Sequence, residues 1–370
     1  NRAVLEEAMQ SEGFLPFPSE WWHFDAPGWE NYPVSDQPLW AYSGNTVRIL
    51  SGTRQETKLA GFYMAQDYGL YGDLKCQFTA MEDQDKLITA LMNGDADLAV
   101  VSPAAAKNRG ALPELAVLAA LYPDFVGKNA DGIVLVRKDR LAAERERLLS
   151  FARSTLAGLE LAEKYPDAAA MAVLRRNREM SFEDCRQSIV ELGKRYKKNA
   201  PAALYQEAWT RTFGTEIPSP AVEVFSPEVP STLPARYLCP VTVAAAGELA
   251  HLAGDLTQGA ERVFGSEAVV VKTGGSEASA RLVGLGLSDF GLATAGVVAE
   301  MEAGTGRFAG EAHSVRQVAV LYTSTAGEPV LLIASREVPG PWKEGFKTMA
   351  GAFRDSLRSS FFAPGEARSA

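Results

Sequence analysis

The feature that most constrains the fold is an alternation of strands and helices that occurs twice along the chain. Short apolar runs that end in small polar residues are followed by amphipathic stretches. Strands that alternate with helices of roughly 10–15 residues are typical of a mostly parallel α/β sheet. The expected strands of the first block are 47–50, 74–79, 96–101, 115–121 and 132–137, and those of the second block are 241–245, 268–272, 289–293, 318–322 and 330–335. The sequence therefore predicts an α/β protein with two lobes.

The segments around these blocks have different compositions. Residues 140–200 have a helical pattern throughout, and Ser181 followed by Asp184 is a helix-capping signal. Six prolines fall within residues 215–240, which favours an extended connector. A terminal helix is expected near 341–361. The resulting division is 1–44, 45–214 (first lobe with a helical extension), 215–240 (connector) and 241–370 (second lobe with the terminal helix).

The two blocks also share a short pattern. Leu91–Ala99 and Leu285–Ala293 both carry a glycine followed, three residues later, by an aspartate that begins an apolar run. This is a weak internal repeat at the level of the fold, without the short fixed period of a solenoid.

Composition excludes several classes of function. The net charge of −9 and the lack of a basic run argue against nucleic-acid binding. No apolar run is long enough for a membrane span, and no signal peptide is visible, so the compartment stays unknown from composition. The chain begins at Asn1 within a helical pattern, and we expect the true start to have been removed by truncation. The three cysteines form no metal or disulfide pattern.

The carboxyl ends of the expected strands are the candidate binding site. In open α/β sheets ligands bind at this edge, and small hydroxyl residues and glycines before helices leave backbone N–H groups for an anion. Helix caps and tight turns need the same residue types, so that interpretation stays open. Thr273-Gly274-Gly275-Ser276 lacks P-loop spacing, and nucleotide hydrolysis is not expected. The predicted ligand-binding residues are Ser51, Thr53, Thr79, Ser102, Thr273, Gly274, Gly275, Ser276 and Thr294.

The first block resembles a known family of binding proteins. Its matching runs are Gly61–Tyr71 and Leu91–Leu98, with Tyr165–Ala169 in the following helices. On these runs, residues 46–137 resemble the first lobe of periplasmic binding proteins of ABC transporters, of the alkanesulfonate or thiamine-precursor type. Residues 148–195 look like the C-terminal helices of that family. The family's second lobe is missing from its usual place after Asp139.

The second block resembles a related family. Its matching segments are Lys272–Ser276, Leu287–Leu292 and Val320–Tyr322. On these, residues 240–337 are similar to the first lobe of TAXI-type solute receptors. Together the resemblances imply two type 2 periplasmic-binding-protein-like lobes with mostly parallel sheets. They also imply a small-molecule ligand, an ABC or TRAP membrane permease as partner, and a place in the periplasm or cell envelope.

The most specific motif lies near the start, in the run Glu20-Trp21-Trp22-His23-Phe24. With Asn1–Leu5 and Gly13-Phe14, it makes residues 1–42 resemble the C-terminal end of VanX-type D-alanyl-D-alanine dipeptidases. That resemblance implies Glu20 as general base and His23 as a zinc ligand. The family's other two ligands come from an SxHxxGxAxD segment, which these 370 residues do not contain. No cofactor is therefore expected as given, and zinc only if the peptidase domain is complete.

Three interpretations remain open from the sequence. The first is a non-enzymatic solute-binding protein of the ABC-transporter type that captures a small, anionic molecule at its strand tips. The second is a zinc D-alanyl-D-alanine dipeptidase, incomplete here, fused to a binding-protein-like region. The third is a truncated or recombined reading frame with no coherent activity. Zinc analysis separates the first two, and we expect no stoichiometric zinc in this chain.

Overall fold

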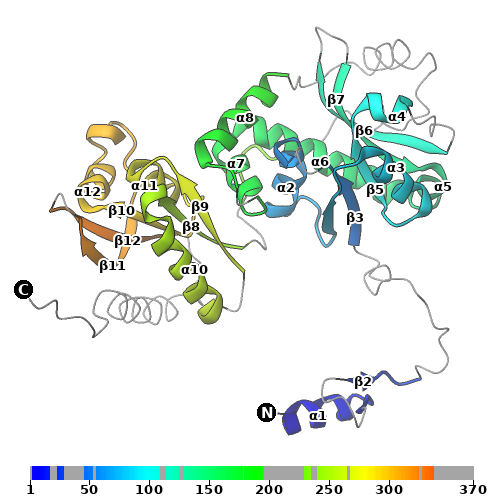
Figure 1. The fold of residues 1–370 in the computed structure, drawn as a ribbon, viewed down its shortest axis with the longest axis horizontal. Helices are drawn as coiled ribbons and strands as arrows, with labels where there is room; N and C mark the ends of the chain where they lie inside the picture. The colour runs from blue at the N-terminus through cyan, green and yellow to red at the C-terminus, as the bar shows by residue number, and fades with distance from the viewer. Residues whose placement is uncertain are drawn as a thin grey trace, which may run out of the picture. The chain divides into compact units, whose positions relative to one another are not determined.

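The chain divides into two compact units, Asn1–Thr46 and Val47–Ala370, in a computed structural model (Figure 1). The model describes several separate stretches of the chain. The described residues are 2–16, 23–28, 46–52, 56–108, 114–124, 129–177, 179–195, 229–234, 240–264, 267–324 and 327–336. The first unit holds helix α1 (Arg2–Ser11) and an antiparallel pair of two-residue strands, β1 (Leu15–Pro16) and β2 (Phe24–Asp25). The expected terminal helix and nearly all of the connector lie outside the described residues.

The first sheet has five strands in the order β4-β3-β5-β7-β6. Strand β5 pairs parallel with β3 and antiparallel with β7, and β6 and β7 form an antiparallel hairpin. The strands are β3 (Thr46–Ser51), β4 (Lys75–Ala80), β5 (Leu98–Val101), β6 (Leu115–Asp124) and β7 (Asn129–Arg137).

Helices connect these strands and then continue as a helical segment after β7. The connecting helices are η3 (Glu56–Leu59), α2 (Ala60–Asp67), α3 (Gln84–Asn93) and α4 (Pro103–Asn108). The helical segment consists of α5 (Lys138–Ala143), α6 (Arg145–Lys164), α7 (Pro166–Leu174) and α8 (Phe182–Arg195). The predicted cap of α8 is confirmed, because Ser181 Oγ accepts from the Asp184 amide at 3.1 Å and donates to Asp184 Oδ2 at 2.7 Å.

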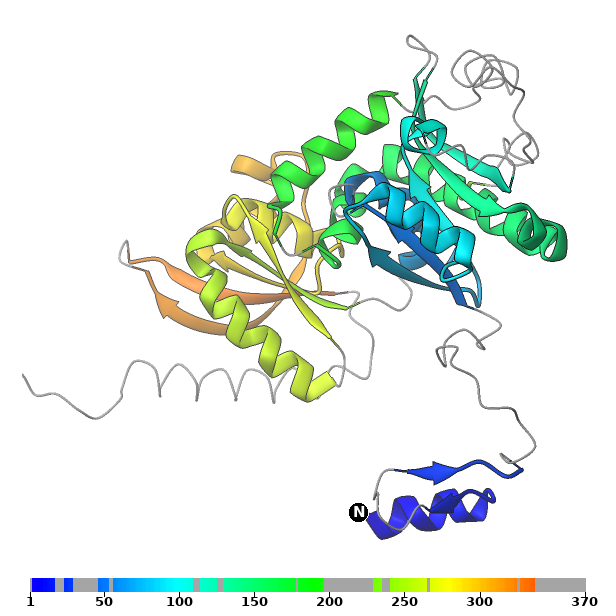
Figure 2. The same ribbon diagram turned by 45° about the vertical axis from the view of Figure 1, so that its right-hand side comes forward.

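The second sheet also has five strands, in the order β11-β12-β10-β8-β9. Strands β8, β9 and β10 are parallel, whereas β12 runs antiparallel to both β10 and β11. Helix α10 crosses one face of this sheet (Figure 2). The elements are β8 (Val241–Ala246), η5 (Gly247–Leu249), α10 (Ala250–Phe264), β9 (Ala268–Thr273), α11 (Ser276–Gly284), β10 (Phe290–Thr294), α12 (Ala295–Ala303), η6 (Gly306–Phe308), β11 (Val315–Thr323) and β12 (Pro329–Ser335).

The two sheets have the same topology. If the strands of each sheet are numbered along the chain, both have the spatial order 2-1-3-5-4, and in both the fifth strand is antiparallel to the third. The predicted α/β class with two lobes is therefore confirmed. The sequence predicted mostly parallel strands, and the alternation of strands and helices did not reveal that the last two strands of each sheet form an antiparallel hairpin.

Both faces of the inner strands of each sheet are buried, which explains their nearly continuous apolar runs, for example in β5, β8 and β12. In β7, Val134 and Val136 face the helices α2 and α6, while Ile133 and Leu135 face α3. Strand β8 shows the same alternation of period two, since Val243 packs on the α10 side and Ala244 on the opposite side.

The helical segment shares its core with the second lobe. Ala244, Val271, Leu282 and Leu287 of the second lobe belong to the same buried cluster as the residues of α6, α7 and α8. Arg175, directly after α7, has a fully buried side chain that forms an ion pair with Asp67 at 2.7 Å and donates to the Leu287 carbonyl at 3.1 Å. Apolar packing and the hydrogen bond from buried Arg175 to the Leu287 carbonyl thus join the first lobe to the second.

None of the helices described is long and apolar enough to cross a membrane.

Candidate functional site

The aspartate of the internal repeat has the same structural role in each lobe. Asp97 lies just before β5, and its carboxylate accepts from the Arg48 amide at 2.8 Å. Asp289 lies just before β10, and its carboxylate accepts from the Thr242 amide at 2.9 Å and the Thr242 hydroxyl at 2.8 Å. In both lobes the third strand is thereby tied to the first at the edge opposite the candidate binding site. The glycine three residues earlier has a positive φ in both copies, 85° at Gly94 and 70° at Gly286.

A second matched contact lies at the other end of the third strand, at the candidate site. In the first lobe, the Ser102 amide donates to Gln84 Oε1 of the first residue of α3 at 3.1 Å. In the second lobe, the Thr294 amide donates to Ser276 Oγ of the first residue of α11 at 3.3 Å. Ser102, Ser276 and Thr294 were all predicted as ligand-binding residues. Their contacts hold the end of the third strand against the start of the helix that precedes it, so they also have a structural role.

A cavity of about 790 Å³ opens beside the strand tips of the second lobe. Its volume is within the range of small-molecule binding sites. It brings the ends of β9 and β10 and the start of α11 together with α7 and α8. The lining residues are Asp167, Phe182, Arg186, Gly274, Gly275, Ser276, Glu277, Ala278, Arg281, Leu282, Thr294, Val297, Arg307 and Glu311.

The start of α11 differs from its counterpart in the first lobe in one respect. Helix α3 is capped by Asp83, whose carboxylate accepts from the amides of Asp85 and Lys86 at 2.9 and 3.3 Å. The residue that precedes α11 is Gly275, which has no side chain to cap the helix. A carboxylate therefore occupies the helix start in the first lobe, whereas in the second lobe the same position faces the cavity.

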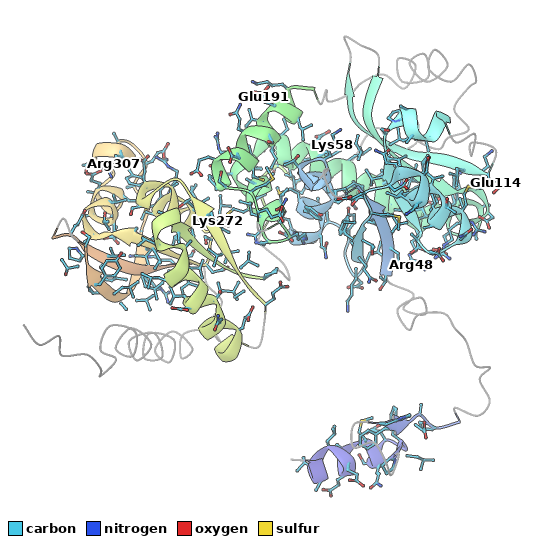
Figure 3. The ribbon with its side chains drawn as sticks, in the orientation of Figure 1. Arg48, Lys58, Glu114, Glu191, Lys272 and Arg307 are labelled. Carbon is cyan, nitrogen blue, oxygen red and sulfur yellow. The ribbon has the colours of Figure 1, made fainter. Side chains whose placement is uncertain are left out.

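Three arginines line the cavity together with three acidic residues, so its formal charges balance. Arg281 pairs with Glu311 and, at 3.5 Å, with Glu277, and its guanidinium lies 5.0 Å from the centre of the Phe308 ring. Arg186 pairs with Asp167. Arg307 also lines the cavity; Figure 3 labels its side chain.

A further carboxylate reaches the glycine loop from outside the second lobe. Glu183 in the first turn of α8 accepts a hydrogen bond from the Gly274 amide at 2.8 Å. A Cβ on residue 274 would lie 3.1 Å from Glu183 Oε1, so the absence of a side chain at Gly274 permits this approach. The loop between β9 and α11 therefore donates a backbone hydrogen bond to a carboxylate oxygen, as expected of an anion-binding loop.

The predicted ligand-binding residues fall into two groups. Gly274, Gly275, Ser276 and Thr294 line the cavity, and Thr273 supports it from a buried position, where its hydroxyl lies 2.7 Å from Ser279 Oγ.

None of the predicted residues of the first lobe is among the described residues that line this cavity. Ser51 is buried at the end of β3, Thr79 is exposed on β4, and Ser102 is bonded to Gln84. Thr53 lies outside the described residues.

Sequence reasoning missed the charged residues of the cavity. Arg186 and Asp167 belong to the helical segment, whereas Arg281, Arg307 and Glu311 belong to the second lobe. These residues come from elements far apart in the chain, and no spacing in the sequence associates them.

The predicted metal site is only partly described. His23 Nε2 lies 3.1 Å from Asp25 Oδ1, and Glu20 lies outside the described residues. Within the described stretches, no three His, Cys, Asp or Glu side chains lie together in a way that could hold a metal ion. A zinc site needs about three protein ligands. The described residues therefore do not fit a zinc centre.

Comparison with known proteins gave two matches of different kinds. The family model described as D-ala-D-ala dipeptidase matches residues 1–39, which confirms the predicted resemblance of the N-terminal segment. Among solved structures, the chain is similar to the conserved Candida albicans CA3427 gene product, described as defining a new family with the generic periplasmic binding protein fold. That similarity has 11% sequence identity and a TM-score of 0.34, and it covers 52% of this chain and 98% of the other. The comparison with curated proteins found no significant match.

Proposed function

We propose that this chain is a binding protein that captures a small anionic solute in the cavity beside α11. The observation that carries the proposal is the gathering of four predicted residues, Gly274, Gly275, Ser276 and Thr294, around one cavity of about 790 Å³. The two glycines provide backbone amides without side-chain obstruction at the start of α11, where an anion is favoured.

The first lobe supports the choice of an anion. Its own Asp83 places a carboxylate on the start of α3. In the second lobe the same position is Gly275, so a carboxylate from a solute would take the place that a side chain fills in the first lobe. The positive end of the helix dipole favours such a group by roughly 0.3–1 kcal/mol at an exposed site.

We further propose delivery of the solute to a membrane permease of the ABC or TRAP type. This step rests on the resemblance of residues 46–137 and 240–337 to transporter-associated binding proteins. The N-terminal segment keeps its likeness to dipeptidases, but we propose no peptidase role, because its described residues do not fit a zinc centre.

A thermal-shift screen of the full chain tests the proposal. The probes are succinate, methanesulfonate, amino acids and pyrimidines, each added at increasing concentration. A solute at about 100 times its Kd should stabilise the protein by roughly 2.7 kcal/mol, which a shift in Tm would reveal. A panel in which no small anion raises the Tm would refute the proposed function.

A substitution that copies the helix cap of the first lobe locates the site. Gly275→Asp should cap α11 from within the chain and block anion binding while leaving the protein at least as stable, because a Cβ there meets no atom within 4 Å. The matched control is Gly275→Ala, which adds a methyl group but no carboxylate and should keep binding. Equal binding by the Asp and Ala variants would place the solute elsewhere.

A further inference from the structure

Glu183 and the solute have the same target in the cavity. Glu183 Oε1 accepts from the Gly274 amide, and Gly274 lines the cavity in which we place the solute. We propose that Glu183 is a built-in competitor, and that a carboxylate solute binds by displacing its side chain from the glycine loop. This inference rests on the proposed function and adds the ligand class and the means by which the site is regulated.

The contact is long-range in sequence and depends on close approach. Glu183 and Gly274 are 91 positions apart and belong to the helical segment and the second lobe. Glu183 Cδ would lie 3.3 Å from a Cβ at residue 274, tighter than most real Cβ contacts. Glycine at this position thus admits a carboxylate directly against the loop.

Glu183 is not needed by its own helix. Ser181 already caps α8 through the Asp184 amide. Among the residues that the structure describes, the only hydrogen-bond partner of Glu183 is the Gly274 amide. Its side chain is exposed, so it can rotate into water without leaving a buried group unpaired. The contact is therefore one that a solute can replace at little cost.

The neighbouring arginine remains in place when Glu183 moves. Arg186, one turn later on α8, is paired with Asp167 of α7. A solute carboxylate that replaces Glu183 on the loop therefore meets a cavity whose other charged groups are already arranged. The Glu183 side chain and the solute would both bind through a carboxylate oxygen that accepts a hydrogen bond from a backbone amide.

Competition of this kind lowers the apparent affinity by a predictable factor. The apparent Kd equals the intrinsic Kd divided by the fraction of molecules with a free site. If Glu183 occupies the loop about nine-tenths of the time, removing it should tighten carboxylate binding about tenfold.

Calorimetric titration of the full chain with succinate tests the inference, with inorganic phosphate as a second probe. The variant is Glu183→Ala, and the control is Glu191→Ala, which removes one carboxylate from the same helix (Figure 3). Glu191 pairs with Lys194 and is absent from the cavity lining. We expect Glu183→Ala to bind succinate several-fold more tightly than the wild type, and Glu191→Ala to bind like the wild type.

The amide resonance of Gly274 gives a readout independent of affinity. In a ¹⁵N-labelled protein, succinate should shift this resonance in the wild type, and the Glu183→Ala substitution alone should shift it as well. Equal or weaker succinate binding by Glu183→Ala would refute the competitor and leave the proposed function standing. A lack of succinate binding by both proteins would refute the carboxylate solute and the competitor, whereas the thermal-shift panel decides the proposed function. Tighter binding of phosphate but not of succinate would refute the carboxylate class.

Discussion

At the scale of single residues, two aspartates show how the internal repeat is built. Asp97 and Asp289 are almost fully buried, and each accepts hydrogen bonds from the first strand of its own sheet. They differ in their partners. Asp97 pairs with the guanidinium groups of Arg48 at 2.8 Å and Arg140 at 3.3 Å, whereas Asp289 is bonded to Thr242. The first copy therefore ties its strands together through two ion pairs with Asp97.

The charge of Asp97 should give the protein a specific sensitivity to acid. Burial alone would raise the pKa of this carboxyl, but the hydrogen bonds and charge of Arg48, with the charge of Arg140, lower the pKa below its usual value. A lowered folded pKa stabilises the protein above about pH 4, the unfolded value, and that contribution is lost as pH falls through the folded pKa.

We therefore expect Asp97→Asn to lower the free energy of unfolding by about 2 kcal/mol at pH 7. The difference from the wild type should shrink as the pH falls below about 4. Urea denaturation at several pH values measures this. The exposed pair of Asp139 with Arg137 supplies the control, because Asp139→Asn removes a solvent-screened interaction and should have a much smaller effect. A difference between Asp97→Asn and the wild type that does not vary with pH would contradict the prediction.

Residue patterns allowed part of the site to be predicted. The glycine loop and Thr294 were identified because hydroxyl residues and glycines between an apolar strand and a helix are visible in one sequence. Glu183 was not, because its role depends on a contact with a loop 91 positions away. An acidic residue in the first turn of a helix is ordinary, and nothing local marks it as a partner of Gly274.

At the scale of elements, helices α2 and α6 pack unusually closely. A Cβ on Gly158 of α6 would lie 2.1 Å from the Gly61 carbonyl oxygen, and one on Gly61 of α2 would lie 2.4 Å from Leu159 Cγ. The two helices therefore meet backbone to backbone, which only paired glycines permit. This crossing holds α2 against the helical segment that forms one wall of the cavity.

Gly158→Ala should consequently be strongly destabilising, although alanine is the better helix former. The clash is with backbone atoms, so the helices must separate, and we expect a loss of more than about 2 kcal/mol. Gly193→Ala on α8 is the matched control, because its Cβ would meet Glu163 Cγ at an ordinary 3.6 Å. The control should be neutral or should stabilise the protein by up to about 1 kcal/mol. The denaturant midpoints of both variants measure these changes. If Gly158→Ala is as stable as the wild type, the close crossing of α2 and α6 is refuted.

The positions of the strands were predicted better than their directions, and two of the helices were not predicted. All ten expected strands of the two sheets are present, since most of them are apolar runs bounded by turn residues. Helices α4 and α12 were not predicted, because the first has six residues and the second is apolar almost throughout. Neither offers the amphipathic period on which helix prediction depends.

At the scale of the whole molecule, the two lobes are joined through a common core. Ala244 and Val271 pack in the same cluster as α7 and α8, and buried Arg175 bridges Asp67 and the Leu287 carbonyl. The sequence predicted separate lobes linked by a proline-rich connector. It could not predict the shared core, because contacts across more than a hundred positions leave no local pattern.

This shared core predicts that the two sheets unfold together. Hydrogen exchange should give amides in β3 and β10 the same opening free energy, and the loss of both sheets should coincide in a denaturant titration. Arg175→Met should reduce this coupling, because it removes the bridge to Leu287 and leaves buried Asp67 with Arg176 as its remaining ion-pair partner. Two well-separated transitions in the wild type would contradict the prediction.

The bridge made by Arg175 also has a consequence for the order in which the protein matures on the ribosome. Its acceptor at Leu287 is synthesised 112 positions later. Until that carbonyl leaves the ribosome, the first half exposes the apolar surface that the second lobe covers in the folded protein, and the Arg175 guanidinium lacks one of its hydrogen-bond acceptors. We therefore expect the first half to be exposed to chaperone binding during translation, and its folding to be completed only after the second half has been synthesised.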